Sequence, residues 1–200
     1  MFRIGTADWI GELYQMTEPL GRNFWSDFRP ASESRLQNAE QQLGRKLDPE
    51  FCEFYCTIGY GSFPGLEGQF VAPEEFIYGA GPAIYFITGS LTPGKEWATP
   101  EQHARLCLSC GQDNPNPGRF TEESLTLNGV KLYDLLQFGS NGSCCYHQLY
   151  VGPEPAPLRY CLLTDSRAME DKAASFSEGL EKVIGFYLSN MSGGYSPCRS

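Results

Sequence analysis

Residues 39–63, AEQQLGRKLDPEFCEFYCTIGYGSF, decide the fold, because they contain the end of one amphipathic helix and the whole of a second. Leu36, Ala39 and Leu43 recur at helical spacing, which predicts a first helix over residues 32–43. Gly44 follows directly, and a left-handed glycine is a common helix stop. The folded part of the chain is therefore expected to open with a helix that ends at a defined residue.

The second helix is predicted to begin almost at once. Asp48 is a good N-cap, Pro49 suits the first helical position, and Glu50 lies near the positive end of the helix dipole. One apolar face of this helix consists of Phe51, Phe54, Tyr55 and Ile58. The glycine-rich exit Gly59-Tyr60-Gly61 ends it.

The middle of the chain is predicted to form β-strands. Segments rich in β-branched and aromatic residues, bounded by Gly and Pro, cover residues 68–73, 82–89, 133–139, 145–152 and 158–164. Residues 90–131 form a polar stretch that is long for a plain connection, so we expect a functional elaboration or a lid over the sheet. Apolar residues at helical spacing then predict a long C-terminal helix over residues 171–190.

Helices, then a run of strands, then a helix indicate an α+β protein with a mainly antiparallel sheet, flanked by N-terminal helices and a long C-terminal helix. With 200 residues, 41% of them hydrophobic, the chain can bury one sizeable core. We therefore expect a single domain over residues 1–190, with an N-terminal extension (1–31) and a long insertion (90–131). Residues 191–200 are expected to form a flexible tail.

Charge and hydropathy limit the classes of partner that the chain is expected to bind. Twenty-four acidic residues against fifteen basic ones give a net charge of -9, which disfavours direct binding to nucleic acid and favours encounter with cationic surfaces. The longest strongly apolar run, AIYFI at residues 83–87, is far short of the ~20 residues that span a bilayer. A cytoplasmic protein with no membrane partner is expected, and the eight cysteines are then reduced thiols.

The order of the elements and the residues within them resemble the SMI1/KNR4, or SUKH, superfamily. The N-terminal part of the resemblance is Ala39-Glu40…Leu43-Gly44, then Leu47-Asp48-Pro49-Glu50-Phe51, then Gly59…Gly61. The C-terminal part is Phe138-Gly139-Ser140-Asn141-Gly142 before a strand, and Ala174-Ser175-Phe176-Ser177-Glu178-Gly179-Leu180 in the last helix. The resemblance covers residues 32–64 and 133–188 and leaves the middle unmatched.

This resemblance implies a role without catalysis. Bacterial members are immunity proteins that bind and neutralise a cognate toxin, and fungal members are regulatory interaction proteins, which is the alternative here. A basic toxin would suit the acidic chain, and interfaces favour aromatic anchors beside charge. The residues expected to bind the partner are Glu67, Glu74, Glu75, Tyr78, Tyr146 and Tyr150. The competing interpretation is that aromatic residues here are core and the glutamates are simply solvated.

A thiol- or zinc-dependent enzyme is the third hypothesis. Its candidate ligands are His103, Cys107 and Cys110 in an H-x3-C-x2-C pattern, with Cys144, Cys145 and His147 as a second group. Zinc needs about four converging ligands, and the chain has no second C-x2-C or H-x3-H. Cys145 and His147 would share one face of a strand, yet a strand histidine is more often structural. We therefore expect no catalytic residue, no metal and no cofactor.

Overall fold

The computed structural model of this chain describes residues 2–64, 68–78, 126–131, 134–142, 145–164 and 169–192. Within these ranges the helices are α1 (Trp9–Thr17), α2 (Glu33–Leu43), α3 (Pro49–Thr57) and α6 (Phe176–Ser192), with 3-10 turns η1 (Glu18–Leu20) and η2 (Pro73–Glu75). The strands are β1 (Gly61–Ser62), β2 (Gln69–Phe70), β3 (Ile77–Tyr78), β4 (Thr126–Leu127), β5 (Val130–Lys131), β6 (Leu135–Ser140), β7 (Cys145–Tyr150), β8 (Tyr160–Thr164) and β9 (Met169–Ala173).

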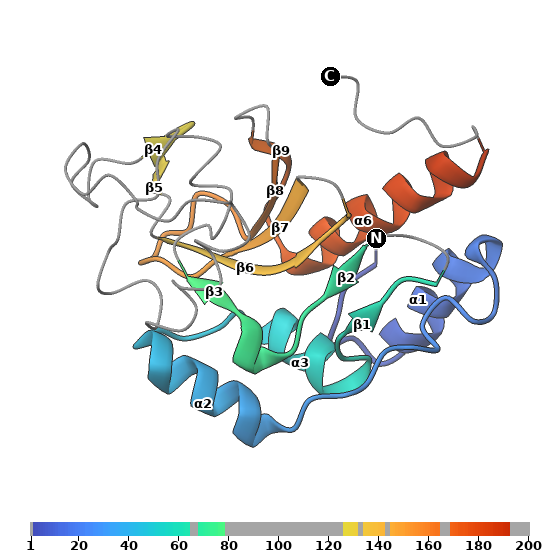
Figure 1. The fold of residues 1–200 in the computed structure, drawn as a ribbon, viewed down its shortest axis with the longest axis horizontal. Coiled ribbons are helices and arrows are strands. Elements are labelled where there is room, and N and C mark those ends of the chain that lie inside the picture. Colours follow the sequence, from blue (N-terminus) through green and yellow to red (C-terminus); the bar gives the residue numbers. More distant parts are fainter. Residues whose placement is uncertain are drawn as a thin grey trace, which may run out of the picture.

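Seven strands form one antiparallel sheet (Figure 1). The order across it is β1-β2-β6-β7-β8-β9, and β3 pairs with the N-terminal half of β6 while β2 pairs with its C-terminal half. Every pairing in the sheet is antiparallel. The predicted α+β architecture, with helices before the sheet and one long helix after it, is confirmed.

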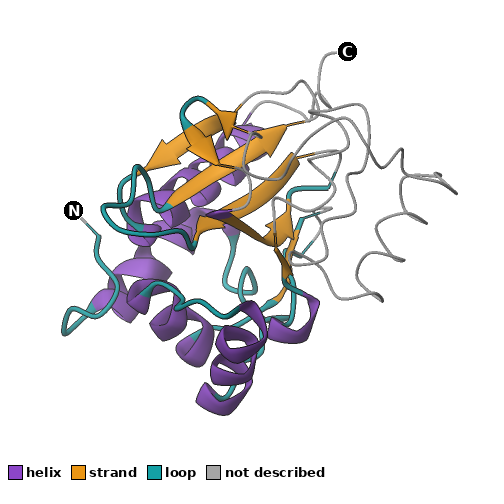
Figure 2. Ribbon diagram, turned by 90° about the vertical axis from the view of Figure 1, so that its left-hand side faces the viewer, coloured by secondary structure: helices purple, strands orange, loops and turns teal. Residues whose placement is uncertain are grey.

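The helices gather on one side of the sheet (Figure 2). The larger core cluster lies between them and the sheet, where the ring of Phe138 from β6 is 5.2 Å from that of Phe51 in α3 and 5.8 Å from that of Phe176 in α6. Since strand side chains alternate, the opposite face carries a second cluster. It consists of Val130, Leu135, Tyr150, Leu158, Cys161, Leu163 and Met169. Both faces of β6, β7 and β8 are therefore buried, which explains their nearly continuous apolar sequences.

The glycine-rich exit of α3 allows the chain to approach another segment closely. Gly59 has φ +99°, and a Cβ built on it would lie 1.8 Å from the carbonyl oxygen of Arg29. Arg29 and Tyr60 pair there as an isolated antiparallel bridge, with each backbone N–H donating to the other residue's carbonyl. Any side chain at position 59 would therefore separate the N-terminal segment from the start of β1.

The N-terminal segment belongs to the same core, although residues 1–31 are predicted as an extension. Trp9 and Leu13 of α1 are buried, and so is Trp25. The indole N–H of Trp25 donates to the Thr17 hydroxyl at 3.1 Å, and the Phe24 ring lies 5.9 Å from that of Tyr187 in α6. These contacts fix α1 and η1 against the rest of the fold.

A single carboxylate joins three parts of the chain that are distant in sequence. Glu50, in the first turn of α3, accepts hydrogen bonds from the backbone N–H of Ser177 at 3.0 Å and from its hydroxyl at 2.9 Å. The same hydroxyl accepts the N–H of Ile4 at 2.8 Å, while Arg3 Nε donates to the other Glu50 oxygen at 3.3 Å. Glu50 thus caps the N-terminus of α6 from another helix and holds the N-terminus of the chain beside it.

Several predicted elements are confirmed, and others are corrected. The helix predicted over residues 32–43 is α2, Gly44 ends it with φ +65°, and Asp48 caps α3 through bonds from the N–H groups of Glu50 and Phe51. The helix predicted from residue 171 is wrong at its start, because residues 169–173 form β9 and Asp171 has a φ of 49°, which no helix accommodates. The helix begins at Phe176 and runs two residues into the predicted tail.

The end of the predicted insertion also contains structure. Residues 126–131 form a hairpin whose turn is Asn128-Gly129, with φ of 51° and 79°. Asn-Gly is the turn pair that such two-residue hairpins prefer, so the signal was present in the sequence. The strand predicted over residues 82–89 lies outside the described residues. In the described part of the chain, no helix is both long enough and apolar enough to cross a bilayer.

We expect Glu50→Ala to lower the free energy of unfolding by about 2 kcal/mol, because Ser177 loses the acceptor for two hydrogen bonds at a helix N-terminus. Denaturant unfolding followed by circular dichroism measures the change. Glu53→Ala is the matched control, since Glu53 is exposed on the same helix, and it should change stability by less than about 0.5 kcal/mol. Equal losses in the two variants would contradict the role given to Glu50.

Candidate functional site

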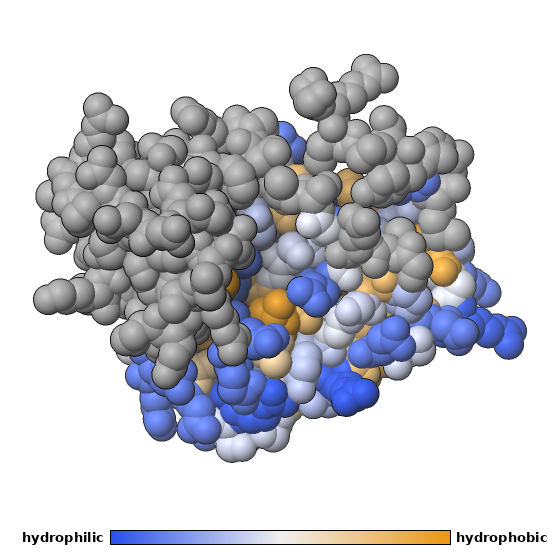
Figure 3. Space-filling model, in the orientation of Figure 1, coloured by the Kyte–Doolittle hydropathy of each residue, from blue (hydrophilic) through white to orange (hydrophobic). Residues whose placement is uncertain are grey.

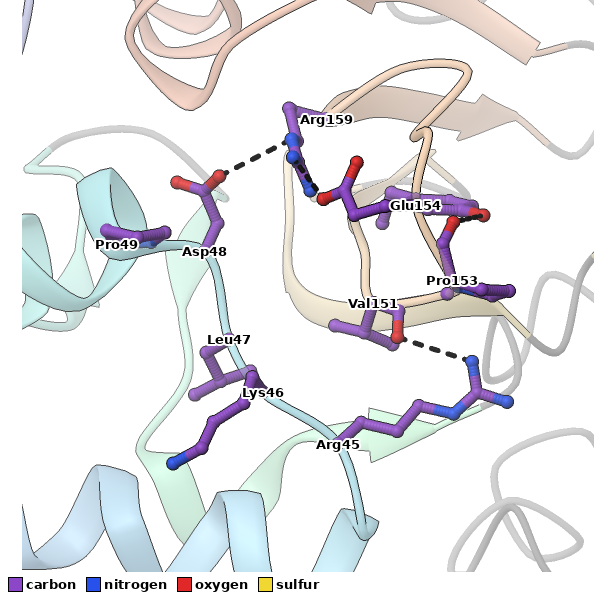
Figure 4. A pocket seen from close by; sticks show the side chains of 11 residues that line it. Arg45, Lys46, Leu47, Asp48, Pro49, Val151, Pro153, Glu154 and Arg159 are labelled. Carbon is purple, nitrogen blue, oxygen red and sulfur yellow. Dashed lines mark hydrogen bonds and ion pairs between the residues drawn. The ribbon is translucent and has the colours of Figure 1, made fainter.

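A cleft of about 790 Å³ opens between the loop that joins α2 to α3 and the loop that joins β7 to β8 (Figure 4). That volume lies in the range of small-molecule sites. The residues lining it are Arg45, Lys46, Leu47, Asp48, Pro49, Tyr150, Val151, Gly152, Pro153, Glu154 and Arg159. The walls therefore combine apolar side chains with charged groups from both loops.

The arginines of this cleft are held by acceptors of the protein itself. Arg159, immediately before β8, makes an ion pair with Glu154, and its Nε lies 3.6 Å from a carboxylate oxygen of Asp48 (Figure 4). Arg45 donates to Asp134 Oδ1 at 2.7 Å and to the Val151 carbonyl at 3.2 Å. Each guanidinium thus faces an internal carboxylate. These contacts connect the loop between α2 and α3 to the loop between β7 and β8.

Asp48 has two structural tasks in this cleft. One carboxylate oxygen caps α3, and the other faces Arg159. Burial raises the pKa of Asp48 above its ordinary value, and the bonds from the Phe51 and Glu50 N–H groups and the charge of Arg159 oppose that rise. Both oxygens of the Asp48 carboxylate therefore have structural roles. The cleft wall around Asp48 connects the start of α3 to Arg159.

The acidic turn η2 holds two of the residues predicted to bind a partner. Glu74 is paired with Arg35 of α2, whose Nε and Nη2 donate to its two oxygens at 2.6 and 2.5 Å. Arg35 also donates to the Tyr60 hydroxyl at 2.7 Å and lies 5.0 Å from the centre of that ring. The hydrogen bonds from Arg35 lower the pKa of Glu74. Glu74 is thus ion-paired with α2, and both it and its neighbour Glu75 are exposed.

Of the six predicted partner-binding residues, the structure describes the side-chain surroundings of Glu74, Glu75, Tyr146 and Tyr150, and these four do not share one exposed face. Tyr150 is a correction: it is 5% exposed in the second core cluster, and its hydroxyl donates to the Pro153 carbonyl at 2.9 Å. Tyr146 is half-buried against the same cluster. Tyr78 lies in β3, opposite Leu136 of β6, and Glu67 lies outside the described residues. Burial of both sheet faces is the reason that Tyr150 lies in the core.

The predicted thiol and metal ligands are only partly described. His103, Cys107, Cys110 and Cys144 lie outside the described residues. Cys145 and His147 lie two apart on β7 and so share a face, as predicted, and both are buried. Within the described ranges, no three metal-binding side chains converge. Burial raises the pKa of Cys52 and of Cys161 to about 12, so neither thiol is activated as a nucleophile.

His147 lies among aromatic rings in the main core. Its Nδ1 is 2.8 Å from the Tyr160 hydroxyl, and its ring lies 5.4 Å from that of Phe70. Nε2 is buried without a hydrogen-bond partner. Burial lowers the pKa of His147 to about 3, so the imidazole is neutral at physiological pH. The side chain is structural, and it is not exposed to a substrate.

Sequence reasoning missed a pair of buried amides on the second face of the sheet. Gln137 of β6 and Gln148 of β7 are directly paired in register, and they are 8% and 0% exposed. Oε1 of Gln137 and both polar side-chain atoms of Gln148 have no hydrogen-bond partner. The only sequence signal was a glutamine inside each of two strongly apolar segments. An unsatisfied buried amide lowers the stability of a fold, so the Gln137–Gln148 pair is a locally destabilising feature of the sheet.

No protein-family model matches the chain, and no curated protein matches it significantly. The functional assignment therefore depends on the residues and geometry of this chain.

The free energy of unfolding should fall by about 2 kcal/mol between pH 7 and pH 5 through His147 alone. The histidine takes up a proton near its ordinary pKa in the unfolded chain but stays neutral when folded, since its folded pKa is about 3. Stability therefore rises with pH across this window and is lost as the pH falls. Denaturant titrations at several pH values should show this slope in the natural protein and its loss in His147→Gln. An unchanged slope in the variant would contradict the assignment.

Gln148→Met should raise the free energy of unfolding by about 1 kcal/mol, because it replaces an unsatisfied buried amide by an apolar side chain of similar volume. Thermal and denaturant unfolding measure the gain. Gln41→Met on the exposed side of α2 is the matched control and should change stability by less than about 0.5 kcal/mol. A clear destabilisation by Gln148→Met would mean that the amide has partners in solution.

Proposed function

We propose that this chain is a cytoplasmic immunity protein of the SUKH type, which binds a cognate toxin protein and neutralises it by stoichiometric inhibition. The chain performs no reaction in this proposal. It blocks the toxin's active site or substrate groove by occupying it. The partner is a basic protein, such as an enzyme that acts on nucleic acid.

The structural roles of the resembling motifs support the proposal. In the first motif, Glu40 accepts the backbone N–H of Leu47 at 3.0 Å and the Lys46 ammonium at 2.6 Å, which fixes the turn between α2 and α3. In the last motif, Ser175 Oγ accepts the N–H of Glu178, and the Glu178 carboxylate accepts the N–H of Ala174. This reciprocal arrangement is close to a capping box. The motifs thus define the start or end of α2, α3 and α6.

The net charge of -9 is the observation that carries the choice of partner. Hydrophilic residues follow the edge of the molecule where α2 lies (Figure 3). Burial raises the pKa of Cys56, and the carboxylates of Glu33 in α2 and Glu53 in α3 raise it further, so a negative charge of each helix lies near Cys56. A surface of this kind speeds association with a basic protein and discourages acidic ones.

Co-expression tests the proposal. The toxin candidates are the toxins encoded beside the gene for this chain, and we expect one of them to stop growth when expressed alone and to be tolerated with this protein. The purified pair should form an equimolar complex of nanomolar affinity whose association rate falls steeply with added salt. Several weaker partners and no protection would favour the regulatory scaffold. Turnover of a small molecule, lost on replacing one polar side chain, would refute both.

A further inference from the structure

Two free cysteines lie four positions apart on α3. Cys52 and Cys56 are both half-buried, and both pack against the main core cluster. Residues at this spacing are neighbours on a helix surface, with Cβ atoms roughly 5–6 Å apart. Within the part of the chain that the structure describes, neither sulfur has a hydrogen-bond partner or a disulfide. The two side chains therefore form a dithiol pair that the fold does not use.

The pair lies where α2 packs against α3 (Figure 1), in surroundings that are mainly acidic. The charged groups that act on the two thiols are Glu40, Asp48 and Lys46 at Cys52, and Glu33 and Glu53 at Cys56. Burial and the carboxylates raise the pKa of both thiols, to about 12 at Cys52, so both are neutral at pH 7. Metal ions that bind thiolates would have to displace both protons, which disfavours zinc and copper here.

The spacing of the pair also disfavours a direct disulfide. A disulfide brings its two Cβ atoms to about 3.5–4.5 Å, which is closer than a regular helix holds residues four apart. The helix resists unwinding, because Asp48 caps its start and Phe51, Phe54 and Tyr55 are fully buried on its inner side. A bridge with one further atom between the sulfurs spans the gap without distorting α3.

We propose that Cys52 and Cys56 form a binding site for trivalent arsenic, taken up as arsenous acid or as an organic arsenical. In the reaction two As–O bonds break and two As–S bonds form. Each thiol proton leaves with a hydroxyl group as water, and arsenic stays trivalent, so the step needs no oxidant or reductant. Arsenous acid is uncharged at neutral pH, so the surrounding carboxylates do not repel it. The site is independent of the proposed toxin binding.

The test uses phenylarsine oxide as the probe and full-length variants. Cys107→Ser with Cys110→Ser removes the C-x2-C pair and serves as the parent. Cys52→Ser and Cys56→Ser each remove one thiol from that parent. Cys56→Ser with Thr57→Cys keeps the number of thiols but moves the second one to a different side of the helix, and is the matched control. Calorimetry and native mass spectrometry measure affinity and stoichiometry, and circular dichroism verifies each fold.

We expect the parent to bind one arsenical with the loss of two titratable thiols. Cys52→Ser and Cys56→Ser should each weaken binding at least about 100-fold, because the second As–S bond then loses its high effective concentration. The matched control should weaken binding similarly. Unchanged affinity in either single variant or in the matched control would overturn the proposal, and so would loss of all binding in the parent.

A measurement on the natural protein needs no substitution. Alkylation with iodoacetamide followed by peptide mapping should show that the arsenical protects Cys52 and Cys56 together. The bound probe should also raise the thermal unfolding temperature, since it binds a pair that the folded helix holds in place. Protection of other cysteines, with Cys52 and Cys56 still alkylated, would overturn the assignment.

Discussion

The first turn of α3 is the constraint on which the rest of this structure depends. Asp48 satisfies the free N–H groups of α3, and two residues later Glu50 satisfies those of α6 through Ser177. The N-termini of two helices separated by more than a hundred residues therefore meet at neighbouring carboxylates. Because each carboxylate also lies at a positive helix end, charge and hydrogen bonding act in the same direction. Arg3 and Ile4 bring the N-terminus of the chain to the same junction.

This junction orients the aromatic core. With its first turn fixed, α3 directs Phe51, Phe54 and Tyr55, all fully buried, towards the sheet and α6. The rings meet mostly edge to face, an arrangement that stabilises a core beyond the area it buries. The same packing takes in the N-terminal segment through Trp25. Helix α1 is consequently a fixed element, and its outer side is a stable surface.

The polar groups of the molecule divide into those that the fold uses and those that it leaves available. The carboxylates of Asp48, Glu50 and Asp134 accept hydrogen bonds from donors within the protein. The charged side chains that line the cleft connect its two loops. His147 is neutral within the core. Ile10 and Tyr14 of α1 and the carboxylate of Glu75 are exposed at the surface. This distribution is what we expect for the binding role proposed above.

The sequence by itself determined α2, α3 and the central strands, because capping residues, glycine stops and apolar periodicity are local signals that the structure bears out. It also located the antiparallel sheet between the helices. Tertiary structure alone decided which polar and aromatic residues are on the surface. Tyr150 was expected at an interface, but burial of both sheet faces puts it in the core, while Tyr14 is exposed on α1, within the predicted N-terminal extension. Exposure depends on which segments pack together, and no local spacing encodes that pairing.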